Sequence, residues 1–275
     1  MIDDQKLAEL EDIARDLRYQ VVRMMGAGKA HHFGGSLSIV ELVTALYFYK
    51  MRYDPANPRW DERDRFVMSK GHTVPTQYAA LARLGVIPME SLATLKRLGS
   101  ILQGHPNACM TPGLEACTGS LGQGLSFANG IAMAARIRGL SIRVYCLLGD
   151  GELHEGQVWE AAMGTAAQRL DNLVAIVDRN RLKSQGLVDE AKPLEPLTDR
   201  WRAFGWEAMT VDGHDLRQMC NALDEAEKVK GRPVAIVANT VKGKGVSFME
   251  DDNNWHYRIP TAEEVEMARK ELGLA

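Results

Sequence analysis

The sequence has few cysteines and no long apolar run. Its four cysteines, Cys109, Cys117, Cys146 and Cys220, show neither Cys-x-x-Cys spacing nor the density of a disulfide-rich domain. The N-terminal stretch Met-Ile-Asp-Asp-Gln-Lys is polar and acidic, and no segment approaches membrane-spanning length. We therefore expect a cytoplasmic protein with reduced thiols and no membrane role.

Charge of either sign is also not in excess. Lys and Arg number 33 against 36 Asp and Glu, a net charge of −3, so electrostatics gives no argument for binding nucleic acid. Hydrophobic residues make up 45% and charged residues 25%, close to globular averages. A length of 275 residues suits one large domain, which we expect to span residues 1–275.

Strand-like and helix-like segments alternate along the chain. Apolar residues at helical spacing predict a helix from Leu7 to Met25, a glycine-punctuated turn follows from Gly26 to Gly35, and Ser38 with Glu41 has the spacing of a capping box that opens a second helix, to Met51. Further strands are predicted at 65–69, on both sides of a helix at 153–168, and at 207–211 and 234–239; further helices at 76–84, 123–138, 215–228 and after a capping box at 260–264. This alternation predicts an α/β fold, a doubly wound, mainly parallel sheet flanked by helices.

A Gly149-Asp150-Gly151 turn follows the first of the two central strands, and Asn180 follows the second after 28 intervening residues, 152 to 179. The carboxyl ends of parallel strands meet at one edge of the sheet, where ligands bind. A carboxylate and an amide oxygen there suit a hard cation such as Mg²⁺ that is shared with a phosphate, and the glycines allow close backbone approach. Gly-Asp-Gly alone is an ordinary turn, so the prediction rests on the complete spaced pattern.

Four histidines lie in predicted loops: His32, His72, His105 and His256. Histidine can donate to a phosphate or an oxyanion and exchange protons near neutral pH, which suggests a shared site if these loops converge. Their spacings match no zinc motif. The remaining histidines, His31, His154 and His214, are expected to be ordinary polar residues, with His214 at the turn that opens the next helix.

Several motifs occur in a fixed order along the chain. They are His32 with Gly34-Gly35-Ser36-Leu37-Ser38, the run Asp64 to His72, Gly119-Ser120-Leu121-Gly122-Gln123-Gly124, the Gly-Asp-Gly…Asn pattern, and Val241-Lys242-Gly243-Lys244-Gly245 followed by His256. Together they resemble the N-terminal, diphosphate-binding part of the transketolase family, over about residues 10 to 260. Two positions depart from the family pattern: Phe33, which is expected to reshape the substrate mouth, and Arg179, where an asparagine is usual.

The resemblance implies thiamine diphosphate and Mg²⁺ (or Ca²⁺ or Mn²⁺) as cofactors and assigns roles to individual residues. The metal would be bound by the side chains of Asp150 and Asn180 and the carbonyl of Leu182. The diphosphate would be held by Gly151, His72, Lys242 and His256, and the rest of the cofactor lined by Gly119, Ser120 and Leu121. Substrate hydroxyls would face His32, His105 and His256. Glu155 and Glu160 would link the two active sites of an assembly, although five residues are about 140° of helix rotation and do not place them on one face.

The resemblance also implies a partner chain. A complete transketolase is more than twice this length and carries a second, pyrimidine-binding domain, so this chain is expected to be half of a split enzyme, forming an α2β2 heterotetramer with a separate C-terminal subunit. That enzyme would transfer a two-carbon ketol unit from a ketose (phosphate) to an aldose (phosphate), as in the pentose phosphate pathway. Two alternatives remain at this point: an α-type subunit of a 2-oxo acid dehydrogenase or decarboxylase, and a non-catalytic diphosphate-binding regulatory module.

Overall fold

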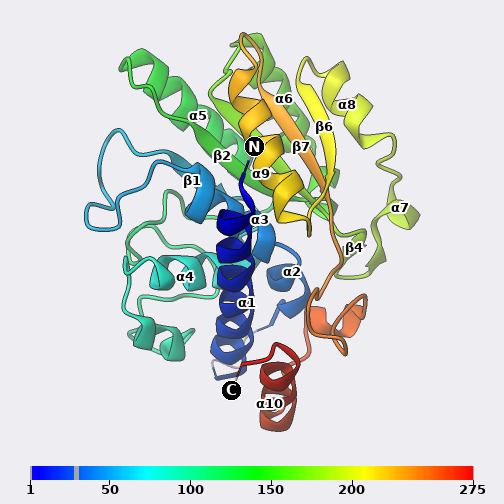
Figure 1. The fold of residues 1–275 in the computed structure, drawn as a ribbon. Coiled ribbons are helices and arrows are strands. Elements are labelled where there is room, and N and C mark those ends of the chain that lie inside the picture. Colours follow the sequence, from blue (N-terminus) through cyan, green and yellow to red (C-terminus); the bar gives the residue numbers. More distant parts are fainter. Residues whose placement is uncertain (1, 28–30, 275) are drawn as a thin grey trace.

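The computed structural model describes residues 2–27 and 31–274, and its centre is a five-stranded sheet with all strands parallel (Figure 1). The strands are β1 (Arg65–Met68), β2 (Val144–Gly149), β3 (Leu173–Arg179), β6 (Glu207–Asp212) and β7 (Val234–Asn239), in the spatial order β1-β2-β3-β7-β6. Because all five run in one direction, the segments that follow them emerge at one edge. The predicted doubly wound α/β fold is confirmed.

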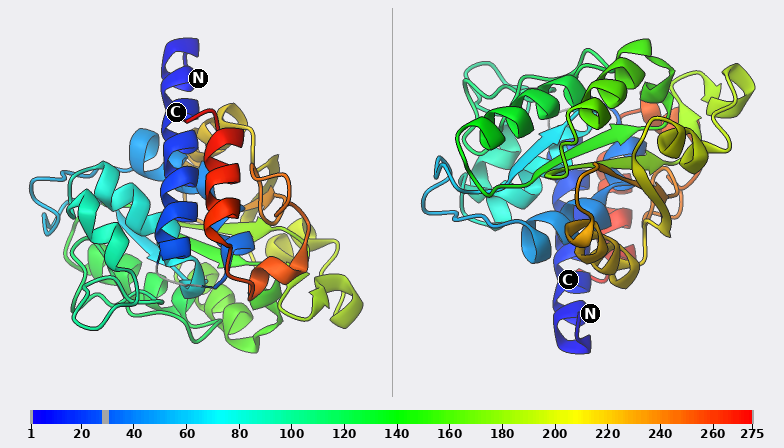
Figure 2. Two further views of the ribbon diagram at one scale, coloured as in Figure 1. Left: turned by 90° about the horizontal axis from the view of Figure 1, so that it is seen from below. Right: turned by 90° about the horizontal axis from the view of Figure 1, so that it is seen from above.

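Helices cover both faces of the sheet, as the two views in Figure 2 show. The helices are α1 (Asp4–Ala27), α2 (Phe33–Leu37), α3 (Val40–Ala45), α4 (Val74–Arg83), α5 (Gly124–Ile137), α6 (Gly156–Ala167), α7 (Val188–Ala191), α8 (Leu197–Ala203), α9 (Leu216–Lys228) and α10 (Ala262–Glu271). One buried core lies between the sheet and α1, α3, α4 and α9, and a second lies between the sheet and α5, α6 and α8.

The alternation of strand side chains builds these two cores. In β2, Tyr145 and Leu147 belong to the first core, and Val144, Cys146 and Leu148 to the second. Successive strand residues point to opposite faces, so a strand buried on both sides is apolar throughout. This is why the continuous apolar runs of the sequence are strands inside the sheet.

The predicted helix boundaries hold except near Ser38. The predicted helix from Ser38 to Met51 is broken into the short helices α2 and α3 and a π-helical turn, Leu46–Lys50, so that prediction is wrong. Ser38 does not act as the predicted N-cap, because its hydroxyl hydrogen-bonds instead with the Gly35 carbonyl and the Asp178 carboxylate, and the N-cap residue of α3 is Ile39. The predicted turn from Gly26 to Gly35 includes residues 28–30, which lie outside the described part.

The segment between β3 and β6 contains structure that the sequence pattern did not predict. A short antiparallel pair, β4 (Leu182–Lys183) and β5 (Gly186–Leu187), is followed by α7 and α8. Single 3-10 turns lie at Gly71–Thr73, Met89–Thr94, Gly151–His154 and Asn253–His256. The predicted capping box on α10 is confirmed, with Thr261 and Glu264 exchanging hydrogen bonds. The β4–β5 pair begins two residues after Asn180, and it therefore lies beside the residues expected to bind the metal.

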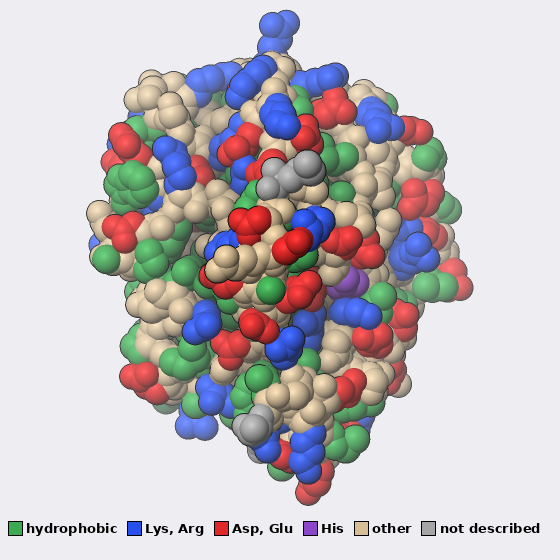
Figure 3. Space-filling view, viewed as in Figure 1, with side chains coloured by type: hydrophobic (Ala, Val, Ile, Leu, Met, Phe, Trp, Pro, Cys, Tyr) green, Lys and Arg blue, Asp and Glu red, His purple; other side chains and the backbone are tan. Residues whose placement is uncertain are grey.

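The surface matches the balanced composition. On the face in Figure 3, acidic and basic side chains are interspersed over the helices. Among the described residues, Cys109 and Cys117 are exposed and Cys146 and Cys220 are buried, all as free thiols. None of the helices in the described ranges has the length and apolar character needed to cross a bilayer.

Candidate active site

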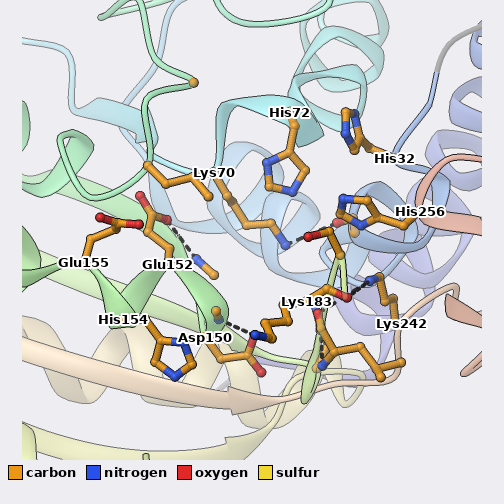
Figure 4. Close-up of a pocket in the computed structure, with 18 of the residues that line it drawn as sticks. His32, Lys70, His72, Asp150, Glu152, His154, Glu155, Lys183, Lys242 and His256 are labelled. Atoms are coloured by element: carbon orange, nitrogen blue, oxygen red, sulfur yellow. Dashed lines mark hydrogen bonds between the residues drawn. The ribbon is translucent and has the colours of Figure 1, made fainter. Parts of the chain in front are cut away.

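A cavity of about 450 Å³ opens at the carboxyl edge of the sheet (Figure 4). Its walls come from the loops after β1, β2, β3 and β7, from the start of α2, and from the 99–124 loop. The lining residues include His32, Gly35, Lys70, His72, His105, Gly119, Leu121, Asp150, Gly151, Glu152, Glu155, Asn180, Leu182, Lys183, Lys242 and His256. Most of the residues named from the sequence therefore share one cavity.

The Gly-Asp-Gly turn and Asn180 meet at the floor of this cavity. One oxygen of buried Asp150 accepts from the Gly151 N–H at 2.7 Å, and the other accepts from the Arg181 N–H at 2.5 Å. Asn180 Oδ1 accepts from the Leu182 N–H at 3.1 Å, so the metal ligands expected from the sequence are held as one cluster. Burial and the nearby Asp178 charge raise the pKa of Asp150 to about 6. Such a carboxylate is better stabilised when a cation binds beside it.

An ion pair that the sequence pattern did not indicate lies beneath the cavity. The Lys70 ammonium, on the loop after β1, donates to Asp178 at the end of β3, and both side chains are buried. Thr240 donates to the other Asp178 oxygen at 2.5 Å, and Asn180 Nδ2 donates to the shared one at 2.7 Å. Burial raises the pKa of Asp178, but Lys70 and these hydrogen bonds outweigh it and hold the pKa below its ordinary value. The pair fixes the side chain of Asn180 from below.

The four loop histidines converge on one side of the cavity. The ring of His32 lies 5.0 Å from that of His72, 4.9 Å from His256 and 6.4 Å from His105, measured between centroids. Burial, and then neighbouring positive charges, lower the pKa of His32 to about 4 and that of His256 to about 3. Burial also lowers the pKa of His72 and of His105. The cluster is therefore neutral near pH 7 and can both donate and accept hydrogen bonds.

Lys242 supplies a buried cation between the loop that follows Asn180 and the histidines. Its Nζ donates to Asn253 Oδ1 at 2.7 Å and approaches the carbonyl oxygens of Leu182 and Lys183 at 3.4 Å. Burial and the positive charge of Lys70 lower the pKa of Lys242 to about 8. A polyanion in the cavity would satisfy this ammonium more completely than three neutral oxygens do.

Glu152 is the second functional candidate that the sequence motifs did not reveal. Its carboxylate accepts hydrogen bonds from Gly122 N–H, Gly149 N–H and the Ser69 hydroxyl, and it is 2% exposed. Figure 4 shows Glu152 and Glu155 opposite the histidines. The signal available in the sequence was a second acid two residues after Asp150, directly after the glycine turn.

The other predicted residues are distributed as follows. Ser120 is exposed and does not line the cavity, and Glu160 lies on the exposed side of α6. Phe33 is fully buried against Trp255, so the expectation that it shapes the substrate mouth is wrong. Arg179, which stands where the family usually has asparagine, forms ion pairs with Asp150, Asp189 and Glu195. Lys244 faces a different cavity and pairs with Glu250.

The donor set fits a magnesium diphosphate better than a polydentate protein metal site. Among the residues described, no three His, Cys, Asp or Glu side chains converge so as to hold a metal ion. Asp150, the Asn180 amide and the Leu182 carbonyl offer a few oxygen ligands, which suits Mg²⁺ shared with phosphate oxygens. Gly35 leaves room beside His72 and Lys70 that a side chain would fill, and the buried Nδ1 atom of His256 has no hydrogen-bond partner within the described ranges. These features form a cradle for an anionic group.

Comparison with known proteins identifies the class of this site. Residues 9–275 match the family model described as "Transketolase, thiamine diphosphate binding domain". The fold and the site thus define a thiamine diphosphate-binding domain. The crystal structure of transketolase from Campylobacter jejuni superposes with a TM-score of 0.91 at 31% identity, covering 99% of this chain and 43% of that one. The chain therefore spans less than half of that solved transketolase.

Relatives of a length similar to this chain indicate more narrowly which kind of transketolase chain it resembles. The 6-deoxy-6-sulfo-D-fructose transketolase subunit SqwG of Clostridium sp. (strain MSTE9) is 47% identical over 239 residues, covering 87% of this chain and 86% of that protein. One of the subunits of the apulose-4-phosphate transketolase of Phocaeicola vulgatus is 44% identical over 255 residues, covering 93% and 90%. The chain belongs to the transketolase family, and the predicted N-terminal, diphosphate-binding subunit of a transketolase-type transferase is confirmed.

Proposed function

We propose that this chain binds the magnesium diphosphate end of thiamine diphosphate and, with a separate pyrimidine-binding chain, transfers a two-carbon ketol unit from a ketose phosphate to an aldose phosphate. The observation that carries the proposal is the single cavity in which Asp150, Asn180 and Lys242 face four neutral histidines. A non-catalytic diphosphate-binding module needs the first set of groups but not the second.

The cofactor-binding roles follow from the positions of the side chains. Asp150, Asn180 and the Leu182 carbonyl would hold Mg²⁺, while Gly151, His72, Lys242 and His256 would hold the diphosphate. Gly119, Ser120 and Leu121 would lie along the next part of the cofactor. Leu121 is 38% exposed, as expected of a residue that a bound group or a second chain covers. Bound thiamine diphosphate supplies the nucleophilic, electron-accepting centre at which a carbon–carbon bond is broken and re-formed.

The histidines would act on the sugar. His32, His105 and His256 would hold its hydroxyls, and a neutral imidazole can take a proton from one hydroxyl while donating to another. The low pKa values keep these rings neutral and unable to repel one another near pH 7. The relatives that act on 6-deoxy-6-sulfo-D-fructose and apulose-4-phosphate suggest that the natural sugar carries an anionic group.

The partner would contribute the remaining half of the cofactor site. Two relatives are described as transketolase subunits, which supports an assembly of this chain with a second polypeptide, and we propose two copies of each. Glu155, at the cavity rim, and Glu160, exposed on α6, lie where such a chain could contact them. We place the complex in the cytoplasm, where the exposed thiols of Cys109 and Cys117 would stay reduced.

The test is reconstitution. The isolated chain should bind thiamine diphosphate weakly and show no ketol transfer, whereas the chain co-purified with a candidate C-terminal transketolase subunit should transfer ketol units from a ketose phosphate in a panel of donors. A parallel assay with 2-oxo acids separates this proposal from a dehydrogenase or decarboxylase subunit. Full ketol transfer by the isolated chain would overturn the requirement for a partner, and 2-oxo acid turnover without ketol transfer would overturn the reaction.

A further inference from the structure

The turn that carries Lys242 is held from behind by side chains outside the cavity. His214, just before α9, binds the backbone N–H of Val241 through Nε2 at 2.8 Å. Arg18, on α1, donates through Nε to the carbonyl of Lys244 at 2.8 Å. Lys242 therefore lies between two backbone groups that are each fixed by a side chain.

Glu41, on α3, joins these two supports. One Glu41 oxygen lies 3.0 Å from His214 Nδ1, and the other forms an ion pair with Arg18. Glu41 and Arg18 are each 7% exposed. Burial raises the pKa of Glu41, but Arg18 and His214 outweigh it and hold that pKa below its ordinary value. The carboxylate is thus charged and fully engaged.

The hydrogen-bond directions fix the state of His214. A backbone N–H can only donate, so Nε2 must carry a lone pair where it meets Val241. The ring proton is then on Nδ1, where it donates to Glu41. Both ring nitrogens and both carboxylate oxygens are used. The series of hydrogen bonds that runs from Val241 through His214, Glu41 and Arg18 to Lys244 therefore has one arrangement of donors and acceptors. Removing His214 would leave the Val241 N–H without its acceptor.

We propose that His214, oriented by Glu41, is a positioning residue that sets the Val241–Lys244 turn so that Lys242 meets the diphosphate. This inference rests on the proposed function, in which Lys242 binds that group. His214 does not line the cofactor cavity and acts only through the backbone of Val241. Neither the sequence motif nor the family match assigns it a role.

The experiment compares His214→Leu with His214→Gln in the full chain, alone and reconstituted with its partner. Leucine removes both hydrogen bonds, whereas the glutamine amide can accept from Val241 and donate to Glu41. Arg217→Leu is the matched control. Arg217 and His214 both line a second cavity, outside the cofactor site, but Arg217 hydrogen-bonds to Ile2 and Asp4 and not to Val241. The readouts are hydrogen–deuterium exchange across residues 240–250 and the dissociation constant of magnesium thiamine diphosphate.

We expect His214→Leu to speed hydrogen–deuterium exchange at residues 240–250 and to raise the dissociation constant of magnesium thiamine diphosphate at least tenfold. Turnover at saturating cofactor should stay within about twofold of wild type. His214→Gln should restore both values to within about threefold, and Arg217→Leu should change neither. If His214→Leu does not fold, Glu41→Gln tests the same link and should give the same loosened turn and weaker binding.

The outcomes separate this inference from the proposed function. Unchanged exchange in His214→Leu, or equal losses in His214→Leu and Arg217→Leu, would overturn the positioning role. Failure of the wild-type complex to bind thiamine diphosphate would overturn the proposed function, while the exchange measurement would still decide whether His214 holds the turn.

Discussion

The carboxylate of Glu152 accepts a hydrogen bond from the backbone N–H of Gly122 at 2.8 Å. Its second oxygen accepts from Gly149 N–H at 3.0 Å, so one buried side chain joins the end of β2 to the 119–124 loop. Burial raises the pKa of Glu152, and its hydrogen-bond partners are all neutral groups. Two walls of the cavity are thus fixed relative to each other by a single acid.

Glu152→Gln should loosen this connection. The glutamine amide presents an NH₂ group to one of the donors that the carboxylate satisfied, and an unsatisfied buried group costs roughly 1–3 kcal/mol. We expect a lower free energy of unfolding in denaturant titration and weaker thiamine diphosphate binding. Glu155→Gln, on the exposed neighbouring turn, should leave the unfolding free energy within about 0.5 kcal/mol of wild type. Equal stability of both variants would contradict the joining role of Glu152.

Asp150→Ala should abolish the magnesium dependence of cofactor binding. The substitution removes the only carboxylate among the proposed metal ligands, so Mg²⁺ would no longer bridge the protein and the diphosphate. Calorimetry with thiamine diphosphate, with and without Mg²⁺, measures the effect, which should exceed about 100-fold. Asp189→Ala is the control, because Asp189 also pairs with Arg179 but does not line the cavity. Unchanged affinity in Asp150→Ala would remove the metal assignment.

His72→Ala and His256→Ala should lower turnover of the reconstituted complex. Groups that move or hold protons at a reacting centre typically contribute about 100-fold to 10,000-fold, and both rings face the cavity where the sugar would bind. The comparison is between turnover at saturating cofactor and the melting temperature of the same variants. If the loss of turnover can be explained by the lower melting temperature of the variants, the two rings have a structural role and not a catalytic one.

The stability of the unloaded chain should fall as the pH drops from about 6.5 toward 4. The pKa of His32 in the folded chain is about 4, and that of His256 about 3, against an ordinary value of 6.5. In that window the unfolded chain binds more protons, so acid favours unfolding, and the histidine contribution is fully present only above pH 6.5. Asp150 acts in the opposite direction: its pKa is raised to about 6 in the folded chain, so its protonation favours the folded state as the pH drops below 6.

The variant that isolates the histidine effect is His256→Asn, which cannot be protonated. Melting temperatures measured at pH 7, 6 and 5 should decrease less steeply in this variant than in the wild type. A saturating amount of magnesium thiamine diphosphate should also reduce the slope, because an anion beside the rings raises their pKa values. Parallel slopes for wild type and variant would show that His256 does not titrate with folding.

The parallel sheet could be predicted because β2 and residues 173–177 of β3 are continuous apolar runs of strand length, as is typical of strands that are buried on both faces. The cluster of Asp150 and Asn180 followed from the rule that strand ends meet at one edge. The break at Ser38 could not be predicted from local spacing. Its hydroxyl is used by Asp178, which is distant in sequence, so a tertiary contact overrides the capping pattern.

The residues that the sequence did not reveal are those whose roles depend on burial. Lys70 and Asp178 are ordinary charged residues in the sequence, and only the fold shows them paired beneath the cavity. Phe33 was misplaced for the same reason, since its contact with Trp255 joins the start of α2 to the segment after β7. Side chains that act by supporting others leave no motif of their own, and His214 is a further instance.

His32 and His256 stand near opposite ends of the chain, yet their rings are 4.9 Å apart. Chains fold progressively as they leave the ribosome, so the pocket is completed only after the segment around His256 has emerged. Thiamine diphosphate would therefore meet its complete set of proposed ligands only after Lys242 and His256 are in place. Its binding to the folded chain would then stabilise that chain by mass action. In cells short of the vitamin, the supply of thiamine would govern how long the folded chain persists, rather than how much of it is produced.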